Sequence, residues 1–395
     1  MVRLAILRGP LLNKPDMTVF EPLLDDFQIV AFVPFRTTYD LSTVRIPLRR
    51  LLCPQTDLKF WHTPRPVRLF DHVRPIAESR LPYMLGLTNA LRGFDIVDSA
   101  ETFFPISLAA IRAKAKWGCK VVLNCSETIT FIGENRCESI ARVTKRNADL
   151  FFPVSAAAKM ALQLEGIPAE RIEIVTHGVD CARFHPEPKD PHWLAQHDLR
   201  IEDKIILFAG RMEWHKGIHD VLLAARYLLD DPEMSDRRLR FVFKGSGVEA
   251  DASARFAGRL GLAPHVRFLT GKVYSDADMP RYYNAADICV FPSKPLPTWE
   301  EQFGIVLIEA MACGKPVVST RCGAIPEVLD DAGILIAPGD AVALAGAIKQ
   351  LATDSELARR LSHAARTRAL DRFDHRLVAA RRRAIYQRLL SEARA

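Results

Sequence analysis

The sequence predicts an α/β protein built from two Rossmann-like domains, each with a parallel sheet covered by helices. Short apolar strands alternate with helical patterns along the chain, and that alternation is typical of parallel sheets. The chain has 395 residues, which is too long for one comfortable core and suggests two domains. The two halves share this architecture, although the sequence contains no internal repeat or low-complexity tract.

The first half carries the strands of the first domain. Helical patterns cover residues 106–117 and 156–164, and an N-terminal domain is expected over residues 1–185, followed by a proline-containing linker at 186–200. The expected strands are apolar runs at 4–7, 28–33, 95–98, 120–124 and 150–155.

The second domain, expected over residues 201–372, opens with an apolar strand at 205–209. A glycine loop follows, Gly210-Arg-Met-Glu-Trp-His-Lys-Gly217, and then a helical pattern over 218–229. Doubly wound folds bind ligands in loops at the carboxyl ends of parallel strands, and the two glycines let the backbone approach an anion closely.

Two cations in this loop suit a diphosphate. Arg211 offers a planar fork of donors and Lys216 a compact point charge. Seen alone, an Arg and a Lys in a glycine loop are more often simply solvated.

Residues 299–323 place two carboxylates, Glu301 and Glu309, around the start of an amphipathic helix that Gly314 ends. Glu301 is expected in the loop before that helix. The N–H groups of the first helical turn can hold phosphate oxygens there, and the carboxylate can hold sugar hydroxyls. A surface helix whose acidic residues complement the macrodipole is the plain alternative for an isolated Glu pair.

Two further strands run into glycine turns, over 241–247 and 266–273. The first contains Gly245 in a Gly-x-Gly turn, and a simple strand-to-helix connection explains such a turn equally well.

Taken together, these motifs resemble the Glu-x7-Glu signature of the retaining GT-B glycosyltransferases of the family 4 type. The positions that match the signature are Glu301, Phe303, Gly304, Glu309, Ala310, Met311, Ala312, Gly314, Pro316 and Val317. Gly-Arg followed by Lys-Gly is the diphosphate clamp of that family, and it lies at the expected distance before the Glu pair. The resemblance implies a GT-B fold, in which two Rossmann-like domains face each other across a cleft and a C-terminal segment, 373–395, returns to the first domain.

The resemblance also implies roles for individual residues. Arg211, Lys216 and Glu301 would be catalytic, the two cations stabilising the leaving diphosphate and Glu301 orienting the donor sugar. Glu309 would bind the ribose hydroxyls. The donor-binding set is Gly210, Gly245, Val273, Phe303, Gly304, Ile305 and Glu309. No metal and no cofactor are expected, because two cations replace the metal and the nucleoside diphosphate sugar is a co-substrate.

The first domain departs from the family pattern. The loop after the first strand has one glycine, Gly9. Where the family shows His-x-His-Glu, this chain has Asp98-Ser-Ala-Glu101, and where the family often has His-Asp after the fourth strand, it has Ser126-Glu127. Gly9, Glu101, Ser126 and Glu127 are interpreted as tentative contacts to the acceptor. Strand-end caps are an equally good explanation for Glu101, Ser126 and Glu127.

Composition narrows the classes of function. The formal charge is +7, with basic residues concentrated in the first half. They can steer anionic sugar nucleotides or hold the protein peripherally on the inner membrane face, and a merely soluble basic surface explains them equally well. Nucleic-acid binding is not favoured, because no aromatic platform accompanies the charge. Eight scattered cysteines and no signal peptide or spanning segment indicate a cytoplasmic protein. No His/Cys cluster has metal-ligand spacing.

The resemblance therefore implies a retaining transferase that moves a hexose from a nucleoside diphosphate sugar to a hydroxyl acceptor. A cell-envelope glycan or a lipid-linked glycan is the expected acceptor. Two alternatives stay open: a glycan phosphorylase or nucleotide-sugar epimerase of the same fold, and a non-catalytic scaffold or partner subunit. The altered first-domain positions motivate the second alternative.

Overall fold

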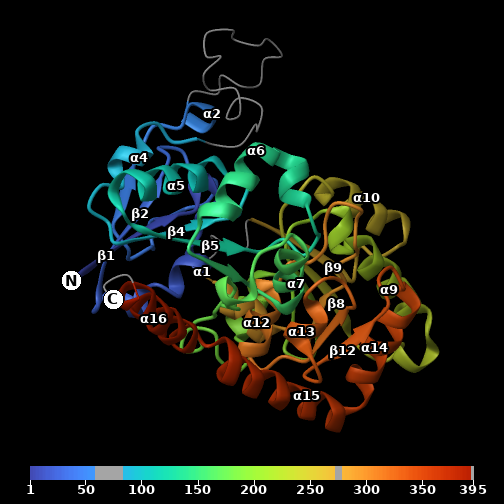
Figure 1. The fold of residues 1–395 in the computed structure, drawn as a ribbon. Helices are drawn as coiled ribbons and strands as arrows, with labels where there is room; N and C mark the ends of the chain where they lie inside the picture. Colours follow the sequence, from blue (N-terminus) through green and yellow to red (C-terminus); the bar gives the residue numbers. More distant parts are fainter. Residues whose placement is uncertain (58–82, 272–277, 393–395) are drawn as a thin grey trace. The chain divides into compact units, whose positions relative to one another are not determined.

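The computed structural model describes residues 1–57, 83–271 and 278–392 and divides the chain into two compact units (Figure 1). One unit comprises Met1–His177 together with Arg376–Ala395, and the other comprises Gly178–His375. The chain therefore leaves the first unit once and returns to it at its end. The domain limits expected from the sequence stay a prediction.

The first unit contains a six-stranded sheet in which every neighbouring pair is parallel. Its order is β3-β2-β1-β4-β5-β6. In the central strand β1, Leu4 and Ile6 join one buried cluster and Ala5 and Leu7 join another, so the sheet is covered on both faces. The strands are β1 Val2–Leu7, β2 Phe27–Val33, β3 Leu48–Arg50, β4 Ile96–Ala100, β5 Lys120–Cys125 and β6 Leu150–Pro153.

Helices complete the first unit. They are α1 Lys14–Thr18, α2 Pro54–Asp57, α4 Leu87–Ala90, α5 Pro105–Trp117, α6 Ile132–Asn147, α7 Ala156–Leu164 and α16 His375–Ser391, with short 3-10 turns at Gly9–Leu11, Glu21–Leu23 and Ala169–Arg171. The last helix, red in Figure 1, buries Val378, Ile385 and Tyr386 in the same cluster as β1 and β2. Hydrophobic burial therefore holds the C-terminal helix to the first unit.

The second unit repeats the plan with a second parallel sheet in the order β12-β11-β10-β7-β8-β9. Its strands are β7 Lys204–Ala209, β8 Leu239–Gly245, β9 Val266–Thr270, β10 Ile288–Phe291, β11 Val317–Thr320 and β12 Ile334–Ile336. Its α-helices are α8 Pro191–Gln196, α9 Ile218–Asp230, α10 Ala250–Arg259, α11 Met279–Ala285, α12 Ile305–Ala312, α13 Ile325–Leu329, α14 Ala341–Thr353 and α15 Ser355–Arg368. Shorter turns lie at Trp214–Lys216 and Pro232–Met234, and a π-helical turn at Ala369–Phe373.

Both sheets follow the Rossmann strand order, so the predicted fold class of two Rossmann-like α/β units is confirmed. The strand order reverses between β1 and β4 in the first unit and between β7 and β10 in the second. Ligands of such sheets bind outside the carboxyl ends of the strands at this switch point. The fold therefore predicts ligand sites in the loops that follow these four strands.

Candidate functional site

The loops that follow β7 and β10 meet at the switch point of the second unit. The clamp loop starts at Gly210, directly after β7, and Ser293 follows β10 by two residues. Gly217, at the end of the clamp loop, has φ +75°, and a Cβ there would lie 2.1 Å from the carbonyl oxygen of Pro292. Only glycine allows the clamp loop to lie this close to the end of β10.

The loop after β8 is bound to the clamp loop. Met212 N–H donates to the carbonyl of Ser246 over 2.9 Å. A Cβ on Gly245 would lie 1.8 Å from the Gly210 carbonyl oxygen, so a larger residue would separate the two loops. The structure thus brings Gly210 and Gly245, both predicted donor-binding residues, into contact.

Lys216 and Glu301 form the centre of the site. Lys216 Nζ lies 2.7 Å from Glu301 Oε2, and Ser293 Oγ donates to the same carboxylate over 2.8 Å. The side chains of Lys216 and Glu301 are 16% and 14% exposed, so solvent reaches both of them only in part. Glu301 lies in a loop, and the N–H of Ala324 donates to its carbonyl and fixes that loop.

Glu301 is held as an anion. Burial alone would raise its pKa, but the Lys216 charge, the hydrogen bonds from Lys216 and Ser293, and the charge of Arg211 together lower the pKa below its ordinary value. A carboxylate that stays ionised can accept hydrogen bonds from sugar hydroxyls.

Arg211 is the exposed member of the group. Its side chain is 53% exposed, and its guanidinium pairs with Glu213 over 2.9 Å. His215 Nε2 lies 3.1 Å from the same carboxylate. Burial and the nearby Lys216 charge lower the pKa of His215, so this histidine is neutral at pH 7.

Helix α12 begins beside Glu301. Gly304 caps it with φ +86°, Ile305 is its first residue, and Phe303 precedes the cap. Phe303 is buried, and its ring meets Phe373 edge-on with the centroids 5.6 Å apart. The Phe303 side chain therefore supports the loop from the core.

Glu309 lies deeper than Glu301. It is buried in α12, and one carboxylate oxygen accepts a hydrogen bond from the Tyr283 hydroxyl over 2.8 Å. Burial outweighs this hydrogen bond and the Arg183 charge, and it raises the pKa of Glu309 to about 7. The remaining predicted donor residue, Val273, lies outside the described residues.

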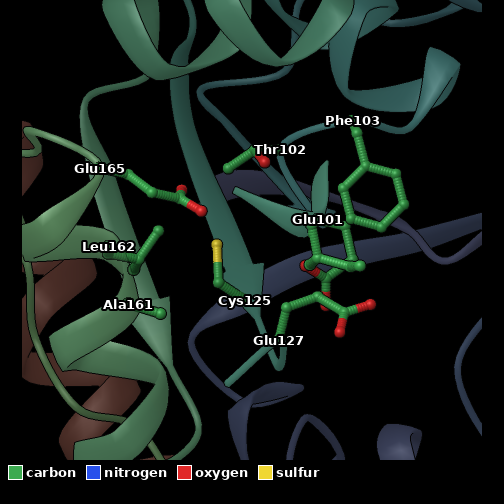
Figure 2. Close-up of a pocket in the computed structure, with 9 residues that line it drawn as sticks. Glu101, Thr102, Phe103, Cys125, Glu127, Ala161, Leu162 and Glu165 are labelled. Carbon is green, nitrogen blue, oxygen red and sulfur yellow. The ribbon is translucent and has the colours of Figure 1, made fainter. Parts of the chain in front are cut away.

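In the first unit, a pocket at the carboxyl ends of β4 and β5 is lined by Glu101 and Glu127 (Figure 2). Glu101 Oε1 accepts a hydrogen bond from the N–H of Ser126 over 2.8 Å, as a strand-end cap does. Figure 2 also shows Glu165 reaching from the end of α7 toward the thiol of Cys125. Three of the tentative acceptor residues thus share one place, whereas Gly9 begins a separate turn after β1.

Several residues of the second-unit site were missed by sequence reasoning. Ser293, Trp299, His215 and Tyr283 contact the motif side chains. Their signal was weak, because each stands in an ordinary loop or helix and becomes relevant only through contacts that the fold creates. Trp299 in particular was read only as the start of the Glu motif.

Residues 1–57, 83–271 and 278–392 contain neither a candidate metal site nor a membrane-spanning helix. No group of three or more His, Cys, Asp or Glu side chains there could hold a metal ion. Within the same ranges, every helix is too short or too polar to cross a bilayer.

Sequence comparison places the chain among glycosyltransferases. A family model described as Glycosyl transferases group 1 matches residues 190–368, and one described as Glycosyltransferase Family 4 matches residues 49–183. D-inositol 3-phosphate glycosyltransferase 2 of Catenulispora acidiphila is 34% identical over 285 residues, which are 68% of this chain and 61% of the relative. The Corynebacterium urealyticum D-inositol 3-phosphate glycosyltransferase is 34% identical over 221 residues, 53% of this chain and 50% of that protein. The chain thus spans less than two thirds of the length of these relatives.

Solved structures share the fold over nearly the whole chain. Anabaena HepE in complex with UDP-glucose superposes with a TM-score of 0.77 at 20% identity, covering 99% of this chain and 100% of that one. Sucrose-phosphate synthase from Thermosynechococcus elongatus gives 0.73 at 20% identity, again over 99% and 100%. The predicted resemblance is confirmed, and the chain belongs to the group 1, family 4 type glycosyltransferases with the GT-B fold.

Proposed function

We propose that the protein is a retaining glycosyltransferase that moves a hexose from a nucleoside diphosphate sugar to a hydroxyl acceptor. The observation that carries this proposal is the ion pair of Lys216 with Glu301 at the switch point of the second unit, with Ser293 on the same carboxylate. A cation for phosphate oxygens and an anion for sugar hydroxyls stand side by side there, as a sugar diphosphate requires.

The chemical task is to stabilise the departing diphosphate. The glycosidic bond to phosphate breaks with oxocarbenium character at the sugar carbon, while negative charge grows on the phosphate oxygens. Lys216, Arg211 and the N–H groups at the start of α12 are donors suited to that growing charge. Such donors act without reorganisation, and losing one typically costs about 10²–10³ in rate.

The two glutamates would divide the recognition of the donor. Glu301, held as an anion, would accept hydrogen bonds from sugar hydroxyls, and Glu309 would bind the ribose. If so, Glu309→Ala weakens nucleotide binding more than it slows turnover, and unchanged affinity by calorimetry removes the ribose role.

The remaining parts of the scheme follow the family pattern. The leaving phosphate would take the acceptor proton on the same face, which retains the anomeric configuration. The two cations would replace a metal ion, and no cofactor would be needed. Turnover that is unaffected by a metal chelator is the expected result.

Donor and acceptor are proposed by chemical class. HepE was solved with UDP-glucose and the curated relatives are named for D-inositol 3-phosphate, so a uridine diphosphate hexose and a polyhydroxyl acceptor are the first substrates to assay. In the first unit, Glu101, Ser126 and Glu127 would contact the acceptor. Gly9, in the turn after β1, would be a further acceptor contact. A cell-envelope or lipid-linked glycan as the natural acceptor, a cytoplasmic location and a peripheral membrane contact are further parts of the proposal.

A ligand panel tests the proposal. Thermal unfolding is measured with nucleoside diphosphate sugars of each base, because a ligand at one hundred times its Kd stabilises the folded protein by about 2.7 kcal/mol. The sugar nucleotide that stabilises most is then assayed for hydrolysis and for transfer to polyols. Stabilisation together with turnover supports a transferase. Stabilisation without any turnover would leave a non-catalytic binding subunit as the better description.

A further inference from the structure

The loop before Glu301 carries a tryptophan, Trp299, whose ring lies against the clamp lysine. Lys216 Nζ lies 4.4 Å from the centre of the indole ring and 2.7 Å from Glu301 Oε2. An ammonium over an indole face is attracted by the ring quadrupole, and the attraction is strongest where water is excluded. The Lys216 side chain is 16% exposed, so water is kept from much of this contact, although one side of the ammonium stays open to solvent.

The position of the ring is fixed by its own loop. Leu296 N–H donates to the Trp299 carbonyl over 2.7 Å, and Trp299 N–H donates back over 3.2 Å, which closes a tight turn. Pro297 lies inside this turn and restricts its backbone. The His215 ring contacts the indole from the clamp loop, with the centroids 4.2 Å apart. The indole is therefore in place before any ligand arrives.

The donors of the Lys216 ammonium show how the contact with Trp299 can orient this group. A lysine ammonium has three N–H donors and no acceptor. Glu301 takes one donor, and the indole face occupies a second direction. Within the described part of the chain, no acceptor besides Glu301 hydrogen-bonds to the ammonium, so a third donor can serve an oxygen of a bound diphosphate.

We propose that Trp299 is a positioning residue of the diphosphate clamp, whose indole face holds the Lys216 ammonium so that one donor is directed at the phosphate. This inference rests on the proposed transferase function. Its consequence is specific. Weakening the ring face should slow the step in which charge grows on the diphosphate, with little change in donor binding.

Substitution gives the first measurement. Trp299→Leu should lower kcat with UDP-glucose about tenfold and change the KM for the donor less than about threefold. Trp299→Phe keeps an aromatic face and should retain at least about one third of kcat. The matched control is Trp117→Leu in the first unit, because Trp117 also carries a lysine over its ring, Lys116 at 4.7 Å. That control should turn over normally.

Fluorinated tryptophan gives the second measurement and keeps the shape of the side chain. Fluorine withdraws charge from the ring face, so kcat should fall stepwise with each added fluorine in the otherwise unchanged protein. Protein with Trp299→Phe, grown on the same fluorinated tryptophans, should not respond, since within residues 1–57, 83–271 and 278–392 no other tryptophan ring lies under the Lys216 ammonium. This arm decides the question if Trp299→Leu fails to fold.

The outcomes separate this inference from the function beneath it. The role of Trp299 is overturned if kcat of the protein with its natural sequence does not change on ring fluorination. It is also overturned if Trp299→Leu keeps kcat within twofold of normal. In both cases the transferase function stands. Absence of turnover with every nucleoside diphosphate sugar overturns both. An equal loss of kcat in Trp117→Leu would show that tryptophan removal acts through general stability, and would also overturn the positioning role.

Discussion

The two units place charged side chains at the same point of the same strand order and use them differently. In the second unit, Lys216 and Glu301 lie at the switch point between β7 and β10 and are still reached by solvent. In the first unit, Arg8 follows β1 and Asp98 lies in β4, and both are buried. The arrangement in the second unit is open to a ligand, and the arrangement in the first unit is closed.

Helix α16 closes the arrangement of Arg8 and Asp98 in the first unit. Arg8 and Arg382 flank Asp98, with nitrogen–oxygen distances of 2.6 and 3.1 Å, and the Tyr386 hydroxyl donates to the same carboxylate. Asn124 donates to Asp98 over 2.6 Å and accepts from Arg382 over 2.7 Å. The C-terminal helix thus completes a buried polar network on β1, β4 and β5, and the shared topology by itself assigns no function.

Removing the central anion of the first unit is the largest perturbation we expect. Asp98→Ala leaves Arg8 and Arg382 buried with their shared carboxylate gone, and breaking a buried pair in this way costs about 3–5 kcal/mol. Urea unfolding of the purified protein measures the loss.

The matched change in the second unit sharpens the contrast. Glu301→Ala also removes a carboxylate between a cation and a hydroxyl, but solvent can reach Lys216 afterwards, so the expected cost is about 1–2 kcal/mol. Equal losses for the two variants would contradict the distinction between a closed and an open arrangement.

Glu309 lies in the second unit but resembles Asp98 of the first unit, because both are buried carboxyl groups. Its pKa is raised to about 7 by burial, from an ordinary 4.5, so its contribution to stability is complete below pH 4.5 and is lost as the pH rises through 7. Glu309→Gln cannot ionise. The free energy of unfolding of the natural protein should therefore fall by about 3 kcal/mol relative to Glu309→Gln between pH 4 and pH 8.5.

Tyr283→Phe tests the cause of that pH dependence. The Tyr283 hydroxyl stabilises the ionised Glu309, so its removal should move the loss of stability to higher pH. A pH dependence that is identical in Glu309→Gln and the natural protein would show that Glu309 is already ionised at neutral pH.

Lys216→Ala should affect turnover more than folding. Loss of one preorganised cation from the departing diphosphate predicts at least about a hundredfold lower kcat, equivalent to about 2.7 kcal/mol. Lys349→Ala is the control, because Lys349 pairs with Asp231 and Glu233 at the surface of the same unit. Near-normal turnover by folded Lys216→Ala protein would refute the clamp.

Much of the fold could be predicted from local pattern. The expected strands at 4–7, 28–33 and 120–124 each end and begin within two residues of β1, β2 and β5, because apolar runs in parallel sheets are nearly continuous. The short edge strands β3 and β12 escaped prediction. Each has three residues. β3 is Leu-Arg-Arg and has no apolar run, and the apolar run of β12, Ile-Leu-Ile, is too short to tell a strand from a loop or a helix end.

Side-chain partners were harder to predict than elements. The pair of Asp98 with Arg382 spans 284 positions, and nothing local distinguishes Asp98 from a polar residue at the exposed end of a strand. The motif did indicate that Lys216 and Glu301 lie near each other, because the resemblance supplied a long-range relation that periodicity lacks. The burial of Glu309 was not predicted. The motif identifies this residue, but its burial depends on the packing of α11, which the motif does not describe.

The smallest expected effect concerns the hydrogen bond that holds Glu301 ionised. Ser293→Ala removes one of the groups that lower the Glu301 pKa, so that pKa should rise. Because activity is lost as Glu301 protonates, the acid limb of the pH profile of kcat/KM should move to higher pH, while kcat/KM at neutral pH, where Glu301 stays ionised, should change little.

The control for this change is Ser319→Ala, whose hydroxyl donates to the Phe291 carbonyl inside the sheet and does not touch Glu301. It should lower stability and leave the acid limb where it is. If both serine variants shift the acid limb equally, the limb reports the pH dependence of folding of the second unit and not the ionisation of Glu301. The Lys216–Glu301 pair would then have a structural role, as the Asp98 network has in the first unit.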